Sequence, residues 1–199
     1  MRILIIGASG TIGRAVLGEL GGRHEIVTAG RASGDLRVDI CDSHSIRLMY
    51  ERAGALDGVV ATTGKVKFGP LDALTAADFE ESLRDKLMGQ VNLVIIGQEF
   101  LLDGGSFTLT TGELDLDPVL MGSPASLVSG ALNAFVRAAA IELKRGQRIN
   151  AVSPGVIQEA LPVLGAFFRG FEPVPVAKVG RAYAKSVEGA QTGQVYRVS

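Results

Sequence analysis

Cysteine, histidine and tryptophan are scarce in this sequence, whose 199 residues contain one cysteine, two histidines and no tryptophan. The single thiol, Cys41, excludes an internal disulfide, and without a cluster of histidines or cysteines near it we predict no metal site. Long hydrophobic runs are also missing: the apolar stretches are too short to cross a bilayer, and the lone Arg2 before four apolar residues does not make a secretory signal. We therefore expect a cytoplasmic protein that has no membrane partner.

An excess of charge of either sign is absent as well. The chain has 20 lysines and arginines against 21 aspartates and glutamates, a formal net charge of −1, so its charge does not indicate a nucleic-acid partner. Hydrophobic residues make up 47% of the chain, which at this length is enough to bury a full core. Because no repeat, linker or low-complexity tract interrupts it, residues 1–199 are predicted to form a single domain.

Strand-like and helix-like patterns alternate along the chain. This alternation is typical of a parallel sheet covered on both sides, so the predicted fold class is α/β: a doubly wound, Rossmann-like parallel sheet of about seven strands with helices on both faces. The strands are expected near residues 2–6, 25–29, 36–39, 57–61, 104–110, 148–152 and 193–198. The helices are expected near residues 12–21, 43–53, 72–101, 123–145 and 176–187. The Asp42-Ser43 pair fits the N-cap of the second, and Thr75 to Asp78 has the outline of a capping box at a turn within the third.

The first strand runs directly into a glycine-rich loop. Its glycines are spaced Gly-x-x-Gly-x-x-Gly between four apolar residues and a helical pattern that begins near Ile12. Glycines let bare backbone N–H groups approach a pyrophosphate, and the N-terminus of the following helix favours the same negative charge. An ordinary turn is the alternative, but the strand before the loop and the helix after it favour a dinucleotide site. The cofactor-binding residues predicted there are Gly7, Ser9, Gly10, Thr11, Ile12 and Gly13.

With several further segments, the whole chain resembles the short-chain dehydrogenase/reductase family. These segments are Val38-Asp39-Ile40, Ala61-Thr62-Thr63-Gly64, and the block from Gly130-Ala131-Leu132 through Asn150 to Ser153-Pro154-Gly155. The resemblance implies a fold that binds NAD(H) or NADP(H). It implies that Asp39 and Ile40 border the adenine, that Gly64 closes the fourth strand beside the cofactor, and that Pro154 and Gly155 meet the nicotinamide amide.

The choice between the two cofactors depends on the end of the second strand. An acidic residue there would accept hydrogen bonds from a ribose without a phosphate, but this chain has Gly30-Arg31. A guanidinium at Arg31, with Ser33 and Ser9 nearby, suits a 2′-phosphate, so we predict NADP(H) rather than NAD(H). The alternative is that Arg31 is an ordinary solvated surface residue.

The catalytic positions of the family are changed in this chain. Its Tyr-x-x-x-Lys pair corresponds to Ala125 and Ser129, and its orienting serine corresponds to Gly112 or, with a one-residue gap, to Thr111 or Thr110. The helix asparagine corresponds to Lys86. The candidate catalytic residues are therefore Lys86, Thr111 and Ser129. An ammonium at Lys86 would act as electrophile or proton donor if burial lowered its pKa, whereas the alternative is a long surface lysine.

Three tyrosines and two residues after the sixth strand are further candidates for the roles that these substitutions leave open. None of Tyr50, Tyr183 and Tyr196 is followed by lysine four residues later, so each is expected to be a packing residue with a solvated hydroxyl. Glu159 or Gln158 stands where the family has a threonine that binds the nicotinamide amide. The wall of the substrate pocket is expected from residues 113–123 and 161–175, the second of which is either a mobile flap or a packed loop.

Two functions follow from these patterns. The first is an NADP(H)-dependent oxidoreductase of the short-chain type that acts on a small carbonyl or alcohol substrate, of unknown identity, with an atypical active site. The second is a nucleotide-binding protein without turnover that serves as a redox sensor or a structural partner. The apolar helical pattern from Ser123 to Lys144 lies where the family forms its subunit contacts, so the resemblance implies a homodimer or homotetramer.

Overall fold

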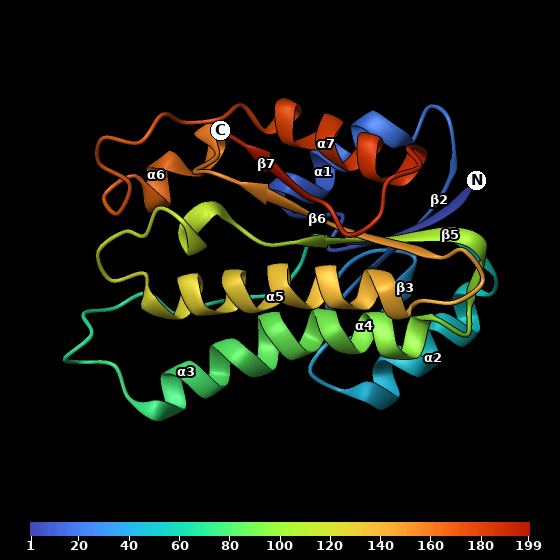
Figure 1. Cartoon of the computed structure of the whole chain (residues 1–199), viewed down its shortest axis with the longest axis horizontal. Helices are drawn as coiled ribbons and strands as arrows, with labels where there is room; N and C mark the ends of the chain where they lie inside the picture. The colour runs from blue at the N-terminus through green and yellow to red at the C-terminus, as the bar shows by residue number, and fades with distance from the viewer.

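The computed structural model describes all 199 residues and contains one parallel sheet of seven strands in the order β3-β2-β1-β4-β5-β6-β7 (Figure 1). The order reverses between β1 and β4, so the carboxyl ends of these two strands border a crevice that is the usual ligand site of such sheets. The fold class is therefore confirmed. The strands are β1 (Arg2–Ile6), β2 (Glu25–Gly30), β3 (Leu36–Arg37), β4 (Leu56–Ala61), β5 (Leu101–Thr110), β6 (Arg148–Pro154) and β7 (Val195–Val198).

Helices cover both faces of the sheet (Figure 1). On one face lie α1 (Thr11–Leu20) and α7 (Val176–Glu188), and on the other lie α2 (Ser43–Ala53), α4 (Gly89–Gly97) and α5 (Ser123–Glu142). The alternation of the first strand explains the two layers, because Ile3 and Ile5 pack on the first face whereas Leu4 and Ile6 pack on the second. The remaining helical pieces are α3 (Ala76–Ser82), the π-helical turn η1 (Leu83–Met88), the 3₁₀ turns η2 (Glu113–Asp115) and η3 (Gln158–Ala160), and the short α6 (Leu161–Leu164).

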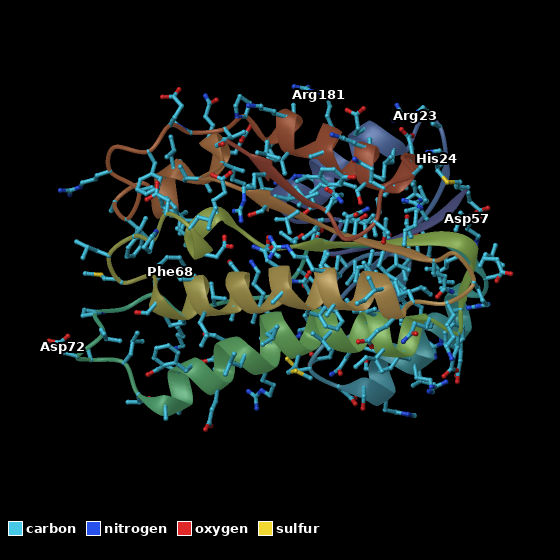
Figure 2. All side chains as sticks on the ribbon, in the orientation of Figure 1. Arg23, His24, Asp57, Phe68, Asp72 and Arg181 are labelled. Carbon is cyan, nitrogen blue, oxygen red and sulfur yellow. The ribbon has the colours of Figure 1, made fainter.

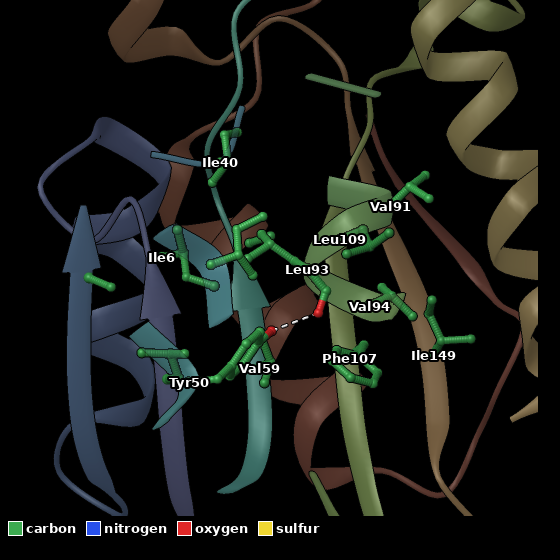
Figure 3. Packing of buried hydrophobic residues seen from close by; sticks show 14 of the residues in the cluster. Ile6, Ile40, Tyr50, Val59, Val91, Leu93, Val94, Phe107, Leu109 and Ile149 are labelled. Carbon is green, nitrogen blue, oxygen red and sulfur yellow. Dashed lines mark hydrogen bonds between the residues drawn. The ribbon is translucent and has the colours of Figure 1, made fainter. Parts of the chain in front are cut away.

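The larger of the two cores contains a fully buried tyrosine. Tyr50 of α2 donates its hydroxyl hydrogen to the carbonyl oxygen of Leu93 in α4 at 2.8 Å (Figure 3). Its ring stacks on that of Phe100 with centroids 5.3 Å apart. The sequence predicted a solvated hydroxyl, but the Tyr50 hydroxyl is buried and hydrogen-bonded. It is therefore not available for proton transfer.

Most predicted elements are confirmed to within two residues, but the region 72–101 is not one helix. Helix α3 starts at Ala76, and the capping box of Thr75 and Asp78 stands at this start instead of at an internal turn. Helix α4 ends at Gly97, and the fifth strand already begins at Leu101, three residues earlier than predicted. The third strand is shorter than expected, because only Leu36 and Arg37 pair with β2. Helix α5 ends at Glu142, three residues before the predicted end at residue 145.

The π-helical turn η1 is the irregularity that matters most for the site. It lies between α3 and α4 in one continuous helical path, and it carries Lys86. A π turn widens the helix and changes the directions of the side chains on either side of it, and such turns are frequent at functional sites. The structure therefore gives Lys86 a different exit direction from that of a regular α-helix.

Helix α5 is long and apolar enough to cross a membrane by length and composition, with a mean hydropathy of 1.2 over its most apolar window. Here it is a core helix, because Val128, Leu132 and Val136 are fully buried in the larger core. Leu127 and Ile141 point away from the sheet and remain exposed.

Candidate functional site

The loop between β1 and α1 has the geometry of a phosphate cradle. Gly7 has a φ of 88°, and a Cβ there would lie 2.8 Å from the carbonyl oxygen of Thr62. A Cβ at Gly13 would lie 2.1 Å from the carbonyl oxygen of Gly7, so only glycine allows helix and loop to pack this closely. Gly10 is the N-cap of α1 and no side chain caps the first turn, which leaves its N–H groups for an anion. The cradle fits the pyrophosphate of a dinucleotide.

A small polar cleft lies on the β2 side of this loop. Its volume is about 170 Å³, and residues at or just after the ends of β1, β2 and β4 line it. The predicted residues Arg31, Ile40 and Gly64 line it together with Gly30, Asp85 and others, whereas Asp39 itself does not. Ser33 donates a hydrogen bond of 2.9 Å to Ser9, which joins the end of β2 to the glycine loop.

Arg31 is neither free nor merely solvated. Its guanidinium forms an exposed ion pair with Asp39 at 2.9 Å. The backbone N–H of Cys41 and the Arg31 guanidinium together lower the pKa of the Asp39 carboxyl. The predicted phosphate ligand and the predicted adenine ligand are thus paired with each other in this structure.

A second, largely apolar cavity of about 230 Å³ lies on the other side of the loop, toward β6. It contains all three predicted catalytic residues, Lys86, Thr111 and Ser129, which come from the π turn, the end of β5 and α5. Ala125 lines it as well, at the position of the absent phenol. The remaining predicted residues on its wall are Ile12, Pro154 and Gly155.

Lys86 enters this cavity over the end of β4. A Cβ at Gly64, where φ is 108°, would lie 2.8 Å from Cα and Cγ of Lys86, so the lysine stem packs on the bare glycine. The side chain is half-buried, and no hydrogen bond or ion pair joins its ammonium to the rest of the chain. Burial lowers the pKa of Lys86, and the neighbouring Asp85 opposes the shift only in part. An ammonium of this kind is a better proton donor than an ordinary lysine.

The two hydroxyl candidates differ from Thr110, the alternative for the orienting serine. Thr110 is hydrogen-bonded to the carbonyl oxygen of Ala61 and to the Tyr183 hydroxyl, so it is used within the sheet. Ser129 is only 4% exposed and its hydroxyl has no partner in the chain, while Thr111 makes one long contact of 3.5 Å with the carbonyl oxygen of Val152. The hydroxyls of Ser129 and Thr111 are therefore available to a ligand.

No tyrosine replaces the missing phenol. Tyr183 is fully buried on the opposite face, where burial raises its pKa, and its hydroxyl is paired with Thr110 instead of solvated. Tyr196 donates a hydrogen bond of 3.0 Å to Gln191 and, like Tyr50, does not line the cavity.

Neither Glu159 nor Gln158, the residues expected near the nicotinamide amide, lines the cavity. Glu159 lies at the start of α7, where its carboxylate accepts hydrogen bonds from the Val176 N–H at 3.0 and 3.3 Å. Sequence reasoning missed Glu113, which it placed only in the pocket wall. Its Oε2 would lie 3.2 Å from a Cβ at Gly155, so the carboxylate covers the end of β6 and lines the cavity. Its position at the end of a glycine-containing turn after β5 was the only signal.

The outer wall of the cavity is aromatic. Phe68, from the loop after β4, lines the cavity (Figure 2). Its ring packs on that of Phe167, from the segment after α6, with centroids 5.1 Å apart. Phe168 is buried and meets Phe171 edge to face at 5.5 Å. The segment 161–175 therefore contains a short helix, α6, and is packed by its own phenylalanines against the mouth of the cavity.

These features define a class: a doubly wound fold with a dinucleotide cradle at its switch point and a reaction cavity beside it. Comparison with known proteins agrees. Residues 21–174 match the family model described as enoyl-(acyl carrier protein) reductase. The chain belongs to the short-chain dehydrogenase/reductase family and is thereby placed among its oxidoreductases.

Individual relatives agree with this assignment. The crystal structure of lin1944 from Listeria innocua superimposes with a TM-score of 0.99 and 51% identity over the full length of both chains. A small-chain dehydrogenase solved in complex with NADPH has a TM-score of 0.89 and 26% identity, with 100% of this chain and 96% of that one covered. Versicolorin reductase 1 of Dothistroma septosporum is 27% identical over 78% of this chain and 68% of its own length, and versicolorin reductase stcU of Emericella nidulans is 28% identical over 67% and 53%. The chain thus spans about half of the stcU protein.

Proposed function

We propose that this protein is an NADP(H)-dependent oxidoreductase that interconverts a small carbonyl compound and its alcohol, with Lys86 in place of the missing tyrosine. One observation carries the proposal: an unpartnered ammonium with a lowered pKa lies in the cavity next to the dinucleotide cradle. Unpartnered charge in an apolar cavity is costly, and it is typical of a site whose partner is the ligand.

The residues of the cradle would hold the cofactor. Gly7, Gly10 and Gly13 fit its pyrophosphate, and Arg31 would exchange Asp39 for the 2′-phosphate of NADP(H). An exposed ion pair of this kind is weak, so a doubly charged phosphate can displace the carboxylate. The NADPH bound to the small-chain dehydrogenase of similar fold supports the same choice.

The chemistry follows from the three polar groups of the cavity. When bound, the reduced dinucleotide supplies a hydride. As hydride reaches the carbonyl carbon, the C=O π pair would move to oxygen, and the Lys86 ammonium would give that oxygen its proton. Ser129 and Thr111 would orient the oxygen by hydrogen bonds. A proton taken up from the solvent would restore the ammonium, so each carbonyl reduced consumes one hydride and one proton.

The experiment is a calorimetric titration with NADPH and with NADH, followed by a screen of small carbonyl compounds for NADPH oxidation. We expect NADPH to bind more tightly than NADH, and we expect Lys86→Met to oxidise NADPH far more slowly while binding it normally. Lys144→Met, which removes an exposed lysine beyond the end of α5, is the matched control. If neither nucleotide binds, the proposed function is wrong.

A sensor without turnover is the second candidate. It is favoured by one observation, which is that Ala125 lines the cavity where the proton donor of the family stands and no other phenol reaches it. A sensor would bind NADPH and oxidise it with none of the carbonyl compounds, and Lys86→Met would then change nothing.

The homodimer or homotetramer remains a prediction, as does the cytoplasmic location. The exposed apolar side chains Ile95 of α4 and Leu127 and Ile141 of α5 support self-association through this layer. Light scattering of the purified protein would give the number of subunits.

A further inference from the structure

The cavity contains a second charge that the proposed reaction does not use. Glu113 is half-buried, and its carboxylate has no hydrogen bond or ion pair with any residue of the chain. The carboxylates nearest to it in sequence or in the site are differently placed. Asp115 accepts hydrogen bonds from Asn133 at 2.9 Å and from Arg197 at 3.2 Å, and Asp85 accepts one from the Lys65 N–H at 2.8 Å. Of the two unpaired carboxylates that line the cavity, Glu113 is half-buried whereas Asp117 is exposed.

Two opposite charges therefore line one apolar cavity without neutralising each other. Lys86 rises over Gly64 at the end of β4, whereas Glu113 covers Gly155 at the end of β6, and no ion pair joins them. Keeping both charges apart in such surroundings costs free energy, and a ligand with complementary charges at its two ends would recover it.

We propose that the substrate carries a protonated amine, with its ammonium against Glu113 and its carbonyl oxygen toward Lys86. The inference rests on the proposed function, because it assumes that the carbonyl end is the end that is reduced. It adds the substrate class: a small aromatic or aliphatic amino ketone, or the corresponding amino alcohol in the reverse direction.

The rest of the lining supports an ammonium. Phe168 and Phe171 meet edge to face on the same wall, and the faces of aromatic rings attract cations. Asp117 adds a second carboxylate at the exposed margin of the cavity. The hydroxyl of Ser129 lines the cavity without a hydrogen-bond partner in the chain and is available to a polar group of the ligand at the other end. The volume of about 230 Å³ lies below the range of about 300–1,000 Å³ for drug-sized ligands, so the molecule is small.

The first arm of the test compares two ketones of nearly equal shape. 2-Amino-1-phenylethanone carries an ammonium where 1-phenylpropan-1-one carries a methyl group. We expect kcat/KM for the amino ketone to exceed that for the neutral ketone by about 10- to 100-fold, as for a hydrogen-bonded charge pair. Glu113→Gln should abolish this ratio. The control Glu142→Gln removes one exposed carboxylate outside the cavity, and it should leave the kcat/KM ratio of the two ketones unchanged.

The second arm does not depend on turnover. Calorimetry with 2-phenylethylamine and with its neutral analogue 2-phenylethanol, both in the presence of the dinucleotide, should show preference for the amine in the native protein and none in Glu113→Gln. If neither ketone is reduced but the amine preference is present, the proposed function fails and the ammonium site stands. Equal binding of amine and alcohol by the native protein, or a preference that survives Glu113→Gln, would overturn the inference.

Discussion

The two cavities that flank the glycine loop differ in whether their charged side chains are paired. In the cleft toward β2, the basic residue is paired, since Arg31 is bound to Asp39 at 2.9 Å and both are exposed. In the cavity toward β6, Lys86 and Glu113 are half-buried and unpaired. The adjacent residues Asp85 and Lys86 line different cavities, so a single turn of helix separates the two environments.

The difference separates charges that already have a partner in the protein, such as Arg31, from charges that lack one and are available to a ligand, such as Lys86 and Glu113. An exposed ion pair contributes little to stability and is exchanged at little cost when a stronger anion arrives. A charge without a partner in an apolar cavity costs the fold something at all times, and its presence there is explained by a ligand. The polar cleft is suited to reversible binding of a cofactor, whereas the apolar cavity is suited to the proton transfer of the proposed reaction.

The largest effect is expected at the close contact between Gly13 and Gly7, because this contact shapes the glycine loop that both cavities flank. Gly13→Ala places a Cβ at 2.1 Å from the carbonyl oxygen of Gly7, so it should displace the loop, destabilise the protein and abolish detectable NADPH binding in calorimetry. Gly18→Ala is the matched control in the same helix. It has open space around it and should stabilise the protein by about 0.5–1 kcal/mol. Normal NADPH affinity in Gly13→Ala would contradict the cradle.

The next largest effect would break the apolar cavity alone. Lys86→Met should reduce carbonyl reduction by about 10²–10⁴-fold, the usual contribution of a positioned general acid. Because burial disfavours the ammonium, the same change should raise the free energy of unfolding at pH 7, as measured by urea denaturation. A variant that loses activity together with stability would point to a structural role for the lysine stem on Gly64.

A smaller effect would break the polar cleft alone. Arg31→Ala should weaken NADPH binding about tenfold, since it removes one charge-assisted contact to the phosphate, and should leave NADH binding unchanged. Arg37→Ala, on the adjacent β3, removes an exposed arginine that donates only to the carbonyl oxygen of Gly34 and serves as the control. Equal losses for both nucleotides would show that Arg31 acts on the adenosine and not on the 2′-phosphate.

The smallest expected effect is the pH dependence that the unpaired Lys86 gives to the reduction rate and to stability. The proton donor is the charged form of Lys86, so the rate of reduction should be constant at low pH and fall as pH rises through its pKa, which burial places below the usual lysine range. Lys86→Arg should move this fall to higher pH or remove it. Stability should change in the opposite direction, because the folded state releases this proton more readily than the unfolded state: the free energy of unfolding rises with pH between the two pKa values.

The parts of the molecule that sequence could predict are those governed by local patterns. Strand β1, helix α2 with its N-cap Asp42, and helix α7 follow from apolar periodicity and capping chemistry within a dozen residues. The glycine loop followed from its spacing together with the apolar strand before it and the helical pattern after it. The positions of Lys86 and Ser129 in one cavity followed from the family resemblance, which supplies the long-range arrangement that periodicity lacks.

The parts that sequence could not predict depend on contacts between distant segments or on small changes of helical geometry. The π turn needs one widened hydrogen-bonding ring, which apolar spacing near 3.6 residues does not reveal. Glu159 and Glu113 are both acidic residues after a strand, and only the three-dimensional packing shows that the first caps α7 while the second reaches the cavity. The Arg31–Asp39 pair likewise joins the segment after β2 to the segment after β3.

The π turn at Leu83–Met88 has a consequence for variation in chain length. Removing one residue from this turn would convert it to an α-helical path with α3 and α4 still continuous at its two ends, and would change the direction in which the Lys86 side chain leaves the helix. The core contacts of α4 would survive, but the ammonium would leave the cavity. A single deletion here thus erases the chemistry and spares the fold. In comparisons of lengths among relatives, one residue at this place is more informative than many substitutions elsewhere.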